Sequence, residues 1–332
     1  MDQSSFHNVL VTGGTGFVGS HLVERLIKEG HSVTCLVRDP AQLKWLAGLP
    51  VNIVQGDCSR PDTLEAAVTN ISQVFHVAGL TKARHIADYY TVNHLGTRNI
   101  LEACTRYNPG LRKFILVSSL AAAGPSPNGR LLTDRDAPRP ITDYGRSKLL
   151  AEEETVACKD RFPVVMVRPS AVYGPRDKDM FELFRWAVRG LTLEVAGGER
   201  FINPCYVMDL VQALYLAATK DTASGSIYFI AEDKPYSWSE FREALLSAGN
   251  VKARNLKVPL AVAYLIGLLS ELGGMVTGKP ALTNRQKIRE AVQKYWLCDL
   301  TKTQRELGFR HAYPLQKGLE LTWHWYREQG WL

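Results

Sequence analysis

A tyrosine and a lysine, Tyr144 and Lys148, lie four positions apart in the segment DYGRSKLLAEEE. Positions four apart share one face of a helix, so the Lys148 ammonium can lie beside the Tyr144 phenol. A free phenol has a pKa of about 10 and is a poor acid or base at neutral pH, whereas a neighbouring cation favours the phenolate and lowers that pKa. The pair could therefore move a hydroxyl proton, or it could be an ordinary solvated pair on a helix surface. A third group is needed to orient a substrate oxygen, and VSSLAAAGP offers two hydroxyls, Ser118 and Ser119, at the end of a strand-like run.

A glycine-rich loop lies near the start of the chain, in LVTGGTGFVGSHL. Gly13 permits a tight turn, Gly16 lets the backbone approach a pyrophosphate, and Gly19 lets the following helix pack closely on the preceding strand. The N-terminus of that helix presents free N–H groups and a partial positive charge to phosphates. The loop therefore predicts a dinucleotide site.

The end of the second expected strand indicates which dinucleotide binds. LVRDP places Arg38 there, and an arginine forms a charge-assisted fork with the 2′-phosphate of NADP(H). The neighbouring Asp39 could instead accept the ribose hydroxyls of NAD. NADP(H) is the expected cofactor, with NAD as the alternative. Further on, Asp57 in VQGDCS ends another strand and could accept from the adenine amino group or cap the next helix.

Apolar, β-branched runs alternate with helical segments through the first half of the chain. Strands are expected at NVLVTGG, SVTCLVR, QVFHVAG, KFILVSS and FPVVMVRPS, and helices at GSHLVERLIKEG, DTLEAAVTN, NHLGTRNILEACTRY and DYGRSKLLAEEETVACKD. This alternation predicts an α/β fold with a Rossmann-type, doubly wound parallel sheet. We expect an NAD(P)-binding domain over residues 1–175, with 205–231 returning to it, and a smaller, mostly helical substrate lobe from residues 176–204 and 232–332.

The composition is that of an ordinary globular chain. Its 332 residues are 45% hydrophobic and 22% charged, with a formal net charge of +7. The basic residues are scattered, which favours an anionic cofactor or a solvated surface over nucleic acid. Six dispersed cysteines indicate a reducing compartment, and none has metal-ligand spacing. Without a secretory signal, we expect a cytoplasmic protein with no metal and no nucleic-acid partner.

One apolar run departs from this pattern. VPLAVAYLIGLL, residues 258–269, is uncharged, but Ser270 and Glu271 end it well short of the roughly 20 residues that span a bilayer. The run could form a helix buried over the core or the substrate cleft. It could also make peripheral contact with a membrane surface, which the basic balance would help.

These motifs resemble, in their order, the extended short-chain dehydrogenase/reductases. This superfamily includes sugar-nucleotide epimerases, 3β-hydroxysteroid dehydrogenases and dihydroflavonol reductases. The shared pieces cover nearly the whole chain: the glycine loop, Asp57, VFHVAG, VNHLGTRNILEAC, ILVSS, the Tyr144–Lys148 spacing and RPSAVYGP. The VRDP ending of the second strand is similar to that of the dihydroflavonol reductases, which use NADPH.

The resemblance implies roles for particular residues. Ser119 would orient the substrate oxygen, Tyr144 would move its proton, and Lys148 would hold the nicotinamide ribose. Asn93 would bond main chain near the site, Ser118 would be a buried or cofactor-side hydroxyl, and Arg168 would serve packing and loop anchoring. The expected cofactor contacts are Gly13, Thr15, Gly16, Phe17, Val18, Gly19, Arg38, Asp57, Cys58, Val77, Ala78, Gly79, Val117, Tyr144, Lys148, Pro169, Ala171 and Val172. A homodimer is also implied.

Three functions remain open at this point. The first is an NADP(H)-dependent oxidoreductase that interconverts a secondary alcohol and a ketone on a relatively apolar small molecule. The second is a sugar-nucleotide epimerase or reductase, for which Arg185, Arg189 and Arg200 could bind the diphosphate. The third is a non-catalytic dinucleotide-binding subunit. Leu120 follows Ser119 where related dehydratases have an acidic pair, and the apolar run from residue 258 suits an apolar substrate, so the first function is expected.

Overall fold

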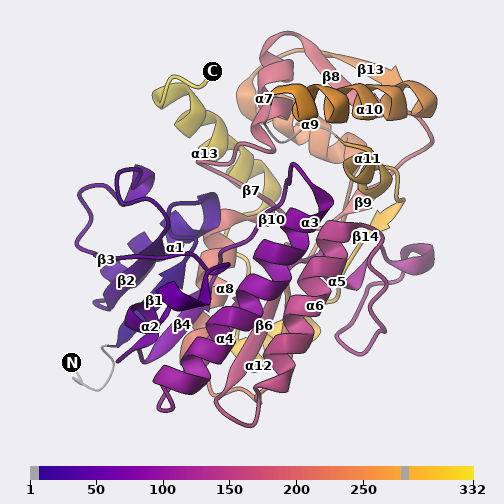
Figure 1. The fold of residues 1–332 in the computed structure, drawn as a ribbon. Helices are drawn as coiled ribbons and strands as arrows, with labels where there is room; N and C mark the ends of the chain where they lie inside the picture. Colours follow the sequence, from indigo (N-terminus) through magenta and orange to yellow (C-terminus); the bar gives the residue numbers. More distant parts are fainter. Residues whose placement is uncertain (1–6, 278–283) are drawn as a thin grey trace.

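A seven-stranded parallel sheet runs through the computed structural model, which describes residues 7–277 and 284–332 (Figure 1). The strand order is β11-β6-β5-β4-β1-β2-β3. In chain order the strands are β1 (Asn8–Thr12), β2 (Ser32–Val37), β3 (Asn52–Gln55), β4 (Gln73–His76), β5 (Lys113–Val117), β6 (Val164–Pro169) and β11 (Ser226–Ile230). The order reverses between β1 and β4, which makes the sheet doubly wound. The predicted fold class is confirmed.

Successive residues of the central strands point to opposite faces of the sheet, and helices cover both faces. Val9 and Val11 of β1 belong to an apolar cluster with α1 (Phe17–Lys28) and α8 (Val207–Thr219). Leu10, between them, belongs to the cluster on the other face with α4 (Gly96–Tyr107) and α6 (Asp143–Ala157). Burial on both faces explains why these strands read as continuous apolar runs.

Two predicted helices differ from the observed ones. The helix predicted in DTLEAAVTN is present but shorter than the segment: it is a single turn, α2 (Glu65–Val68), after the 3-10 turn η3 (Pro61–Thr63). The helix expected from NHLGTRNILEACTRY is α4, but its first residues belong to a π-helical segment, η4 (Tyr90–Leu95), that follows α3 (Ile86–Tyr89). A π-helical turn shifts the register of a helix, and such turns are frequent at functional sites.

The C-terminal part of the chain builds a second layer above the carboxyl ends of the strands (Figure 1). An aromatic cluster holds together α7 (Phe181–Val188), α9 (Trp238–Gly249) and α13 (Leu315–Glu328). Trp323 lies against Gly249, where an added Cβ would collide with the indole, and its Nε1 donates to the Leu245 carbonyl at 2.8 Å. The small residue at 249 therefore sets how closely α9 and α13 approach.

Short strands and helices complete the described residues. β7 (Ala171–Tyr173) pairs with β10 (Pro204–Tyr206), β8 (Leu191–Val195) with β13 (Arg254–Val258), and β9 (Phe201–Ile202) with both β12 (Tyr236–Ser237) and β14 (Tyr295–Trp296). The remaining helical elements are η2 (Lys44–Leu46), α5 (Leu120–Ala123), η5 (Pro127–Gly129), α11 (Arg285–Ala291) and α12 (Thr301–Leu307). Residues 205–231 supply α8 and β11 to the main sheet, whereas the domain boundaries and the homodimer stay predictions.

The apolar run at residues 258–269 forms most of α10 (Leu260–Thr277), and it is not buried. Six of its apolar side chains are between 38% and 58% exposed: Leu260, Val262, Leu265, Ile266, Leu268 and Leu269. Small residues face inward instead, and Gly267 lies against Ile288 of α11. The interpretation as a buried helix is therefore wrong. Within residues 7–277 and 284–332, no helix combines the length and apolar character needed to cross a bilayer.

Candidate active site

The glycine loop between β1 and α1 has the geometry of a phosphate cradle. Gly13 has φ +74°, and a Cβ there would lie 2.7 Å from the amide nitrogen of Ala78. The amide of Gly16 donates to the Gly13 carbonyl at 3.0 Å, which closes the turn. A Cβ on Gly19 would collide with the same carbonyl. The first turn of α1 has no acidic residue, so its free N–H groups can receive an anion without a competing carboxylate.

Arg38 and Asp39, which follow β2, are both exposed but differ in their contacts. One carboxylate oxygen of Asp39 accepts from the Ala41 amide at 3.0 Å, and the other accepts from Gln42 Nε2 at 2.7 Å. The Arg38 guanidinium has no hydrogen bond or ion pair to any residue that the structure describes. Asp39 is thus held in a local turn, whereas the arginine is available to an anionic ligand.

Asp57 follows β3 and holds a local turn; it does not cap the next helical element, since η3 has Arg60 at its N-cap and no side-chain cap, and the adenine contact stays a prediction. Its Oδ1 accepts from both the amide and the hydroxyl of Ser59, each at 2.8 Å. The neighbouring Cys58 side chain is buried in the core, so only its backbone could face a cofactor. Val77, Ala78 and Gly79 follow β4 and lie beside the glycine loop, where the Ala78 amide donates to Thr12 Oγ1 at 3.2 Å.

Tyr144 lies in the first turn of α6, beside Ser119. Thr142 caps this helix, and its hydroxyl accepts from the Gly145 amide at 3.2 Å. Ser119 caps α5 at the carboxyl end of β5, and its hydroxyl is hydrogen-bonded to the Tyr144 phenol. Burial raises the pKa of Tyr144, and the hydrogen bond from Ser119 opposes this effect. The structure therefore brings together the two hydroxyls that the sequence indicated.

Lys148 is buried one turn further along α6, where it faces the carboxyl edge of the sheet. Its Nζ donates to the carbonyl of Val117 at 2.6 Å. Burial lowers the pKa of Lys148 to about 8. The expected effect of this ammonium on Tyr144 stays a prediction, and the structure adds a second cation that lowers the pKa of the phenol, Lys287 of α11. The Lys287 Nζ lies 5.4 Å from the centroid of the Tyr144 ring.

Asn93, in the π-helical segment η4, bonds main chain next to Lys148, as the resemblance implied. Its Oδ1 accepts from the Leu80 amide at 2.7 Å. Its Nδ2 donates to the Leu80 carbonyl at 3.1 Å and to the Ser147 hydroxyl at 2.9 Å. The asparagine thereby joins the loop after β4 to the helix that carries Tyr144.

A buried ion pair links α6 to the strand β6 next to the site. Arg168 donates from Nε and Nη2 to the two carboxylate oxygens of Glu152, at 2.8 and 2.6 Å. The Ser118 hydroxyl donates to the same carboxylate at 2.5 Å, so Ser118 is indeed a buried hydroxyl. Sequence reasoning missed Glu152, although it lies four positions after Lys148 and therefore on the same helix face.

The last group of expected cofactor contacts extends from the same edge of the sheet. Pro169 is the final residue of β6, and the amide of Ser170 donates to the Ile230 carbonyl at 3.0 Å. Ala171 and Val172 then start β7, which pairs with β10. Carboxyl ends of parallel strands meet at one edge of a sheet, so these residues and Val117 flank the space above Ser119.

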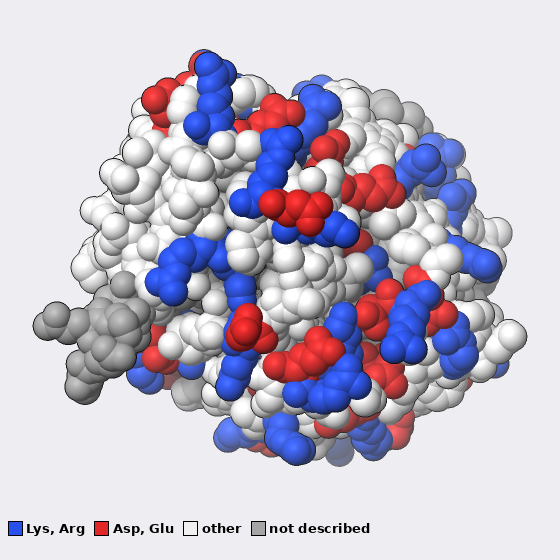
Figure 2. Space-filling view, turned by 90° about the horizontal axis from the view of Figure 1, so that it is seen from below, with Lys and Arg blue, Asp and Glu red and all other residues white. Residues whose placement is uncertain are grey.

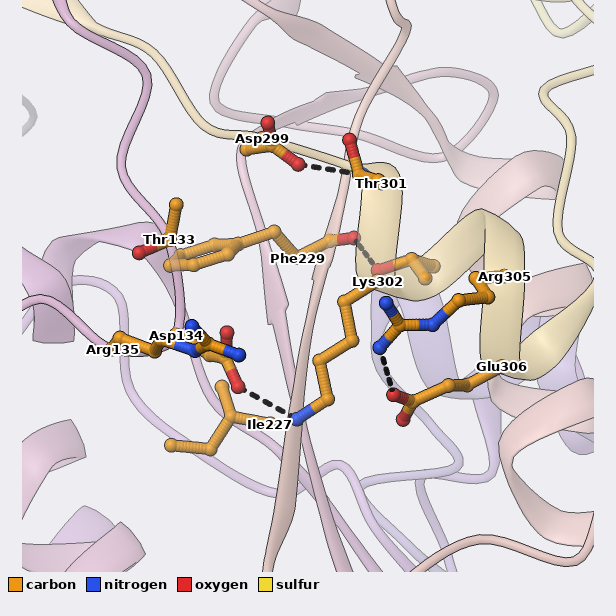
Figure 3. Close-up of a pocket in the computed structure, with 11 residues that line it drawn as sticks. Thr133, Asp134, Arg135, Ile227, Phe229, Asp299, Thr301, Lys302, Arg305 and Glu306 are labelled. Carbon is orange, nitrogen blue, oxygen red and sulfur yellow. Dashed lines mark hydrogen bonds and ion pairs between the residues drawn. The ribbon is translucent and has the colours of Figure 1, made fainter.

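A hollow of about 440 Å³ lies elsewhere, between the loop at residues 133–135, β11 and α12 (Figure 3). It includes none of the expected site residues. Four of its charged side chains already form ion pairs, Lys302 with Asp134 at 2.7 Å and Arg305 with Glu306 at 2.7 Å. A ligand would have to displace these pairs, so the hollow does not compete with the site at Tyr144.

The six cysteines are all free thiols, five of them buried and Cys158 half-buried. Burial raises the pKa of Cys35, Cys58, Cys104 and Cys298 to about 12, which leaves these thiols unreactive at neutral pH. In the part of the chain that the structure describes, no three His, Cys, Asp or Glu side chains gather to hold a metal ion.

A dinucleotide cradle and a Ser–Tyr–Lys constellation at the same edge of a doubly wound sheet define an NAD(P)-dependent oxidoreductase. The model of the NAD dependent epimerase/dehydratase family matches residues 9–231. The chain belongs to this family, within the extended short-chain dehydrogenase/reductases.

Known proteins are similar over almost the whole chain. Ceramide reductase of Caulobacter vibrioides is 31% identical and covers 98% of this chain and 96% of its own. The 3 beta-hydroxysteroid dehydrogenase/Delta 5→4-isomerase of Mycobacterium tuberculosis is 32% identical, covering 94% of this chain and 88% of its own. Among solved structures, MoeE5 in complex with UDP-glucuronic acid and NAD is 26% identical with a TM-score of 0.78, and covers 97% of this chain and 99% of its own.

Proposed function

We propose that this protein is an NADP(H)-dependent oxidoreductase that interconverts a secondary alcohol and a ketone on a relatively apolar substrate. The hydrogen-bonded pair of Ser119 and Tyr144 carries the proposal, because it can hold a substrate oxygen and move its proton. A bound nicotinamide would supply or accept the hydride. Lys148 is positioned to bind ribose hydroxyls, and Tyr144 gives or takes the hydroxyl proton while Ser119 orients the oxygen.

The contacts at the end of β2 support NADP(H) over NAD. An NAD site uses a carboxylate that is free to accept from two ribose hydroxyls. Both carboxylate oxygens of Asp39 are engaged in their own turn, whereas the neighbouring Arg38 guanidinium is exposed. A fork of N–H donors suits the 2′-phosphate that distinguishes NADP(H).

Two of the three candidate residues for a nucleoside diphosphate, Arg185 and Arg200, have partners within the protein, which supports an apolar substrate. Arg200 is buried and donates to the carbonyls of Val195 and Ala196 at 2.6 and 3.2 Å. Arg185 pairs with Glu182 at 2.7 Å. The relatives point the same way, since their names refer to ceramide and to 3 beta-hydroxysteroids. A sugar-nucleotide epimerase or reductase is the second candidate, favoured by the fold likeness to MoeE5 bound to UDP-glucuronic acid.

Replacing the proton donor tests the proposal. Wild-type protein with NADPH should reduce members of a panel of 3-ketosteroids and long-chain keto lipids, and should leave UDP-glucose unchanged. Tyr144→Phe should lower that turnover by about 10²–10⁴-fold, because proton transfer by a positioned group is worth that much. Binding of NADPH, followed by its fluorescence, should stay within a few fold of wild type. Turnover that survives the substitution would sink the mechanism, and activity on the UDP-sugar alone would favour the second candidate.

The exposed face of α10 leads us to propose peripheral contact with an anionic bilayer. The helix presents leucines and isoleucine to solvent. The strand before it, β13, carries the exposed cations Arg254 and Lys257, and Lys252 is exposed just before that strand. Apolar side chains flanked by lysine and arginine match the acyl and headgroup layers of an anionic membrane surface. Figure 2 shows the molecule from below, at the end opposite to α10, and there positive and negative side chains are interspersed. A lipid-like substrate could reach the site from such a surface.

A further inference from the structure

Lys287 is a cation that the chain brings to the reactive tyrosine from far along the sequence. Its Nζ lies 5.4 Å from the centroid of the Tyr144 ring and 3.0 Å from the Glu290 carboxylate. The side chain of Lys287 is 35% exposed, so it is partly shielded from water. Burial disfavours its ammonium, but the Glu290 and Tyr144 side chains raise the pKa of Lys287 above its ordinary value. The lysine therefore stays charged throughout the pH range in which enzymes work.

The helix that carries Lys287 is fixed to the residues directly before Tyr144. Gln286 accepts from the Asp143 amide at 2.7 Å and donates to the Asp143 carboxylate at 2.8 Å. Arg289 donates to the Ile141 carbonyl at 3.3 Å. These contacts tie α11 to the start of α6, so the ammonium cannot drift relative to the ring without breaking them.

Glu290 completes the attachment and also opposes the charge of Lys287. Its Oε1 accepts from the hydroxyl of Thr142, the residue that caps α6, at 2.9 Å. Its Oε2 accepts from Lys287 at 3.0 Å. The carboxylate thus holds the ammonium in place and partly offsets its field at the phenol.

Some groups around the Tyr144 phenol raise its pKa and others lower it. Burial raises the pKa of Tyr144 most, the hydrogen bond with Ser119 and the Lys287 cation lower it, and Glu290 and the Tyr89 ring raise it. Tyr89 of α3 lies 6.0 Å away between ring centroids. Lys148, on the same helix as Tyr144, is directed to the Val117 carbonyl instead. Before any cofactor binds, the cation that offsets burial of the phenol comes from α11.

We infer that Lys287 is a positioning residue of the C-terminal part of the chain. Its positive charge makes Tyr144 easier to ionise, and the negative charge of Glu290 partly offsets this effect. The inference deepens the proposed function, since a phenol that ionises more readily is a better proton acceptor during alcohol oxidation. Lys287 would act on the proton-transferring group in addition to Lys148, which is also expected to bind the ribose hydroxyls.

The ionisation of Tyr144 can be measured without any substrate. Protein labelled at the tyrosine ring Cζ with ¹³C is titrated by NMR from pH 6 to 11.5, and the Tyr144 signal is assigned by its loss in Tyr144→Phe. Removing the cation in Lys287→Met should raise the pH of half-ionisation by about one unit or more, as for an opposite charge within about 4–6 Å. Lys287→Arg should restore the wild-type value to within a few tenths. Glu290→Gln keeps an acceptor for Thr142 but removes the negative charge, so it should shift the titration to lower pH.

Arg285→Met is the matched control, because it removes an exposed cation of the same helix that pairs with Glu271. It should leave the Tyr144 titration unchanged. Identical titrations of wild type and Lys287→Met would overturn the inference, as would shifts of Lys287→Met and Glu290→Gln in the same direction. A phenol that stays neutral to pH 11.5 in wild type would also overturn it. These outcomes are independent of turnover, so failure of the substrate panel would count against the proposed function alone.

Discussion

The proposed preference for NADP(H) can be tested at Arg38. Arg38→Ala should weaken binding of NADPH by about tenfold or more, because charge-assisted hydrogen bonds to a phosphate contribute about 1.5–3 kcal/mol. Binding of NADH should change by no more than a few fold. Fluorescence titration of both dinucleotides measures the two dissociation constants. Equal losses for the two would reverse the assignment and give the ribose contact to Asp39.

At the level of single residues, sequence reasoning succeeded where the chemistry is local. Tyr144 and Lys148 are four apart on one helix, and Ser119 follows a strand that ends at the same edge. Lys287 was missed because it lies in a different lobe, and no spacing in the sequence links it to Tyr144. Helix periodicity places Lys148 on the face of Tyr144, but it does not tell where a long side chain is directed, and Lys148 Nζ donates to the Val117 carbonyl.

Among the helices and strands, the long buried ones were predicted and most of the short ones were not. Strands β1, β2, β4, β5 and β6 were predicted because burial on both faces makes each a continuous apolar run. Two-residue strands such as β9, β12 and β14 are too short to have a periodicity. α11 was not recognised either, since RQKIREA has only one buried residue, Ile288, and no apolar stripe.

α10 was predicted as a helix candidate, but its environment was not. An uncharged run fits a protein core and a membrane surface equally well, and only the neighbouring elements decide between them. The structure packs Ala263 and Gly267 inward and leaves six large apolar side chains of the run exposed.

The proposed membrane contact can be tested at this helix. Leu265 and Leu269 are 54% and 58% exposed, so Leu265→Ser with Leu269→Ser should leave the fold intact. Each buried leucine contributes about 1.5–3 kcal/mol, and the double variant should bind at least about tenfold less to vesicles containing anionic phosphatidylglycerol. Co-sedimentation measures the bound fraction, with Val156→Ser on α6 as the control. Equal binding of wild type and the double variant would remove α10 from the contact.

For the whole molecule, a buried histidine predicts how stability depends on pH. His76 is fully buried between the hydroxyls of Thr12 and Thr97, at 2.7 and 3.1 Å, and burial lowers its pKa to about 3. Below pH 6.5, His76 takes up a proton in the unfolded chain but stays neutral in the folded chain. The free energy of unfolding therefore decreases as the pH is lowered. By pH 5 this one group should remove about 2 kcal/mol. Urea unfolding at pH 8 and pH 5 measures the change.

His76→Gln is the matched variant, because glutamine retains hydrogen-bonding groups and does not titrate. Its overall stability should be lower, but its loss between pH 8 and pH 5 should be smaller than that of wild type by about 2 kcal/mol. The same pH dependence in both proteins would assign the acid sensitivity to other groups, such as His21, whose pKa burial also lowers.

The attachment of α11 to the start of α6 has a consequence for the order in which the protein is made. Synthesis from the N-terminus delivers the glycine loop and all seven strands of the sheet by residue 230, whereas α11 emerges only at residues 285–291. A nascent chain can therefore form a nucleotide-binding sheet with Tyr144 in place before the helix that grips residues 141–143 exists. The segment that carries Lys287, like the exposed apolar helix α10 before it, is therefore made only after every strand of the sheet.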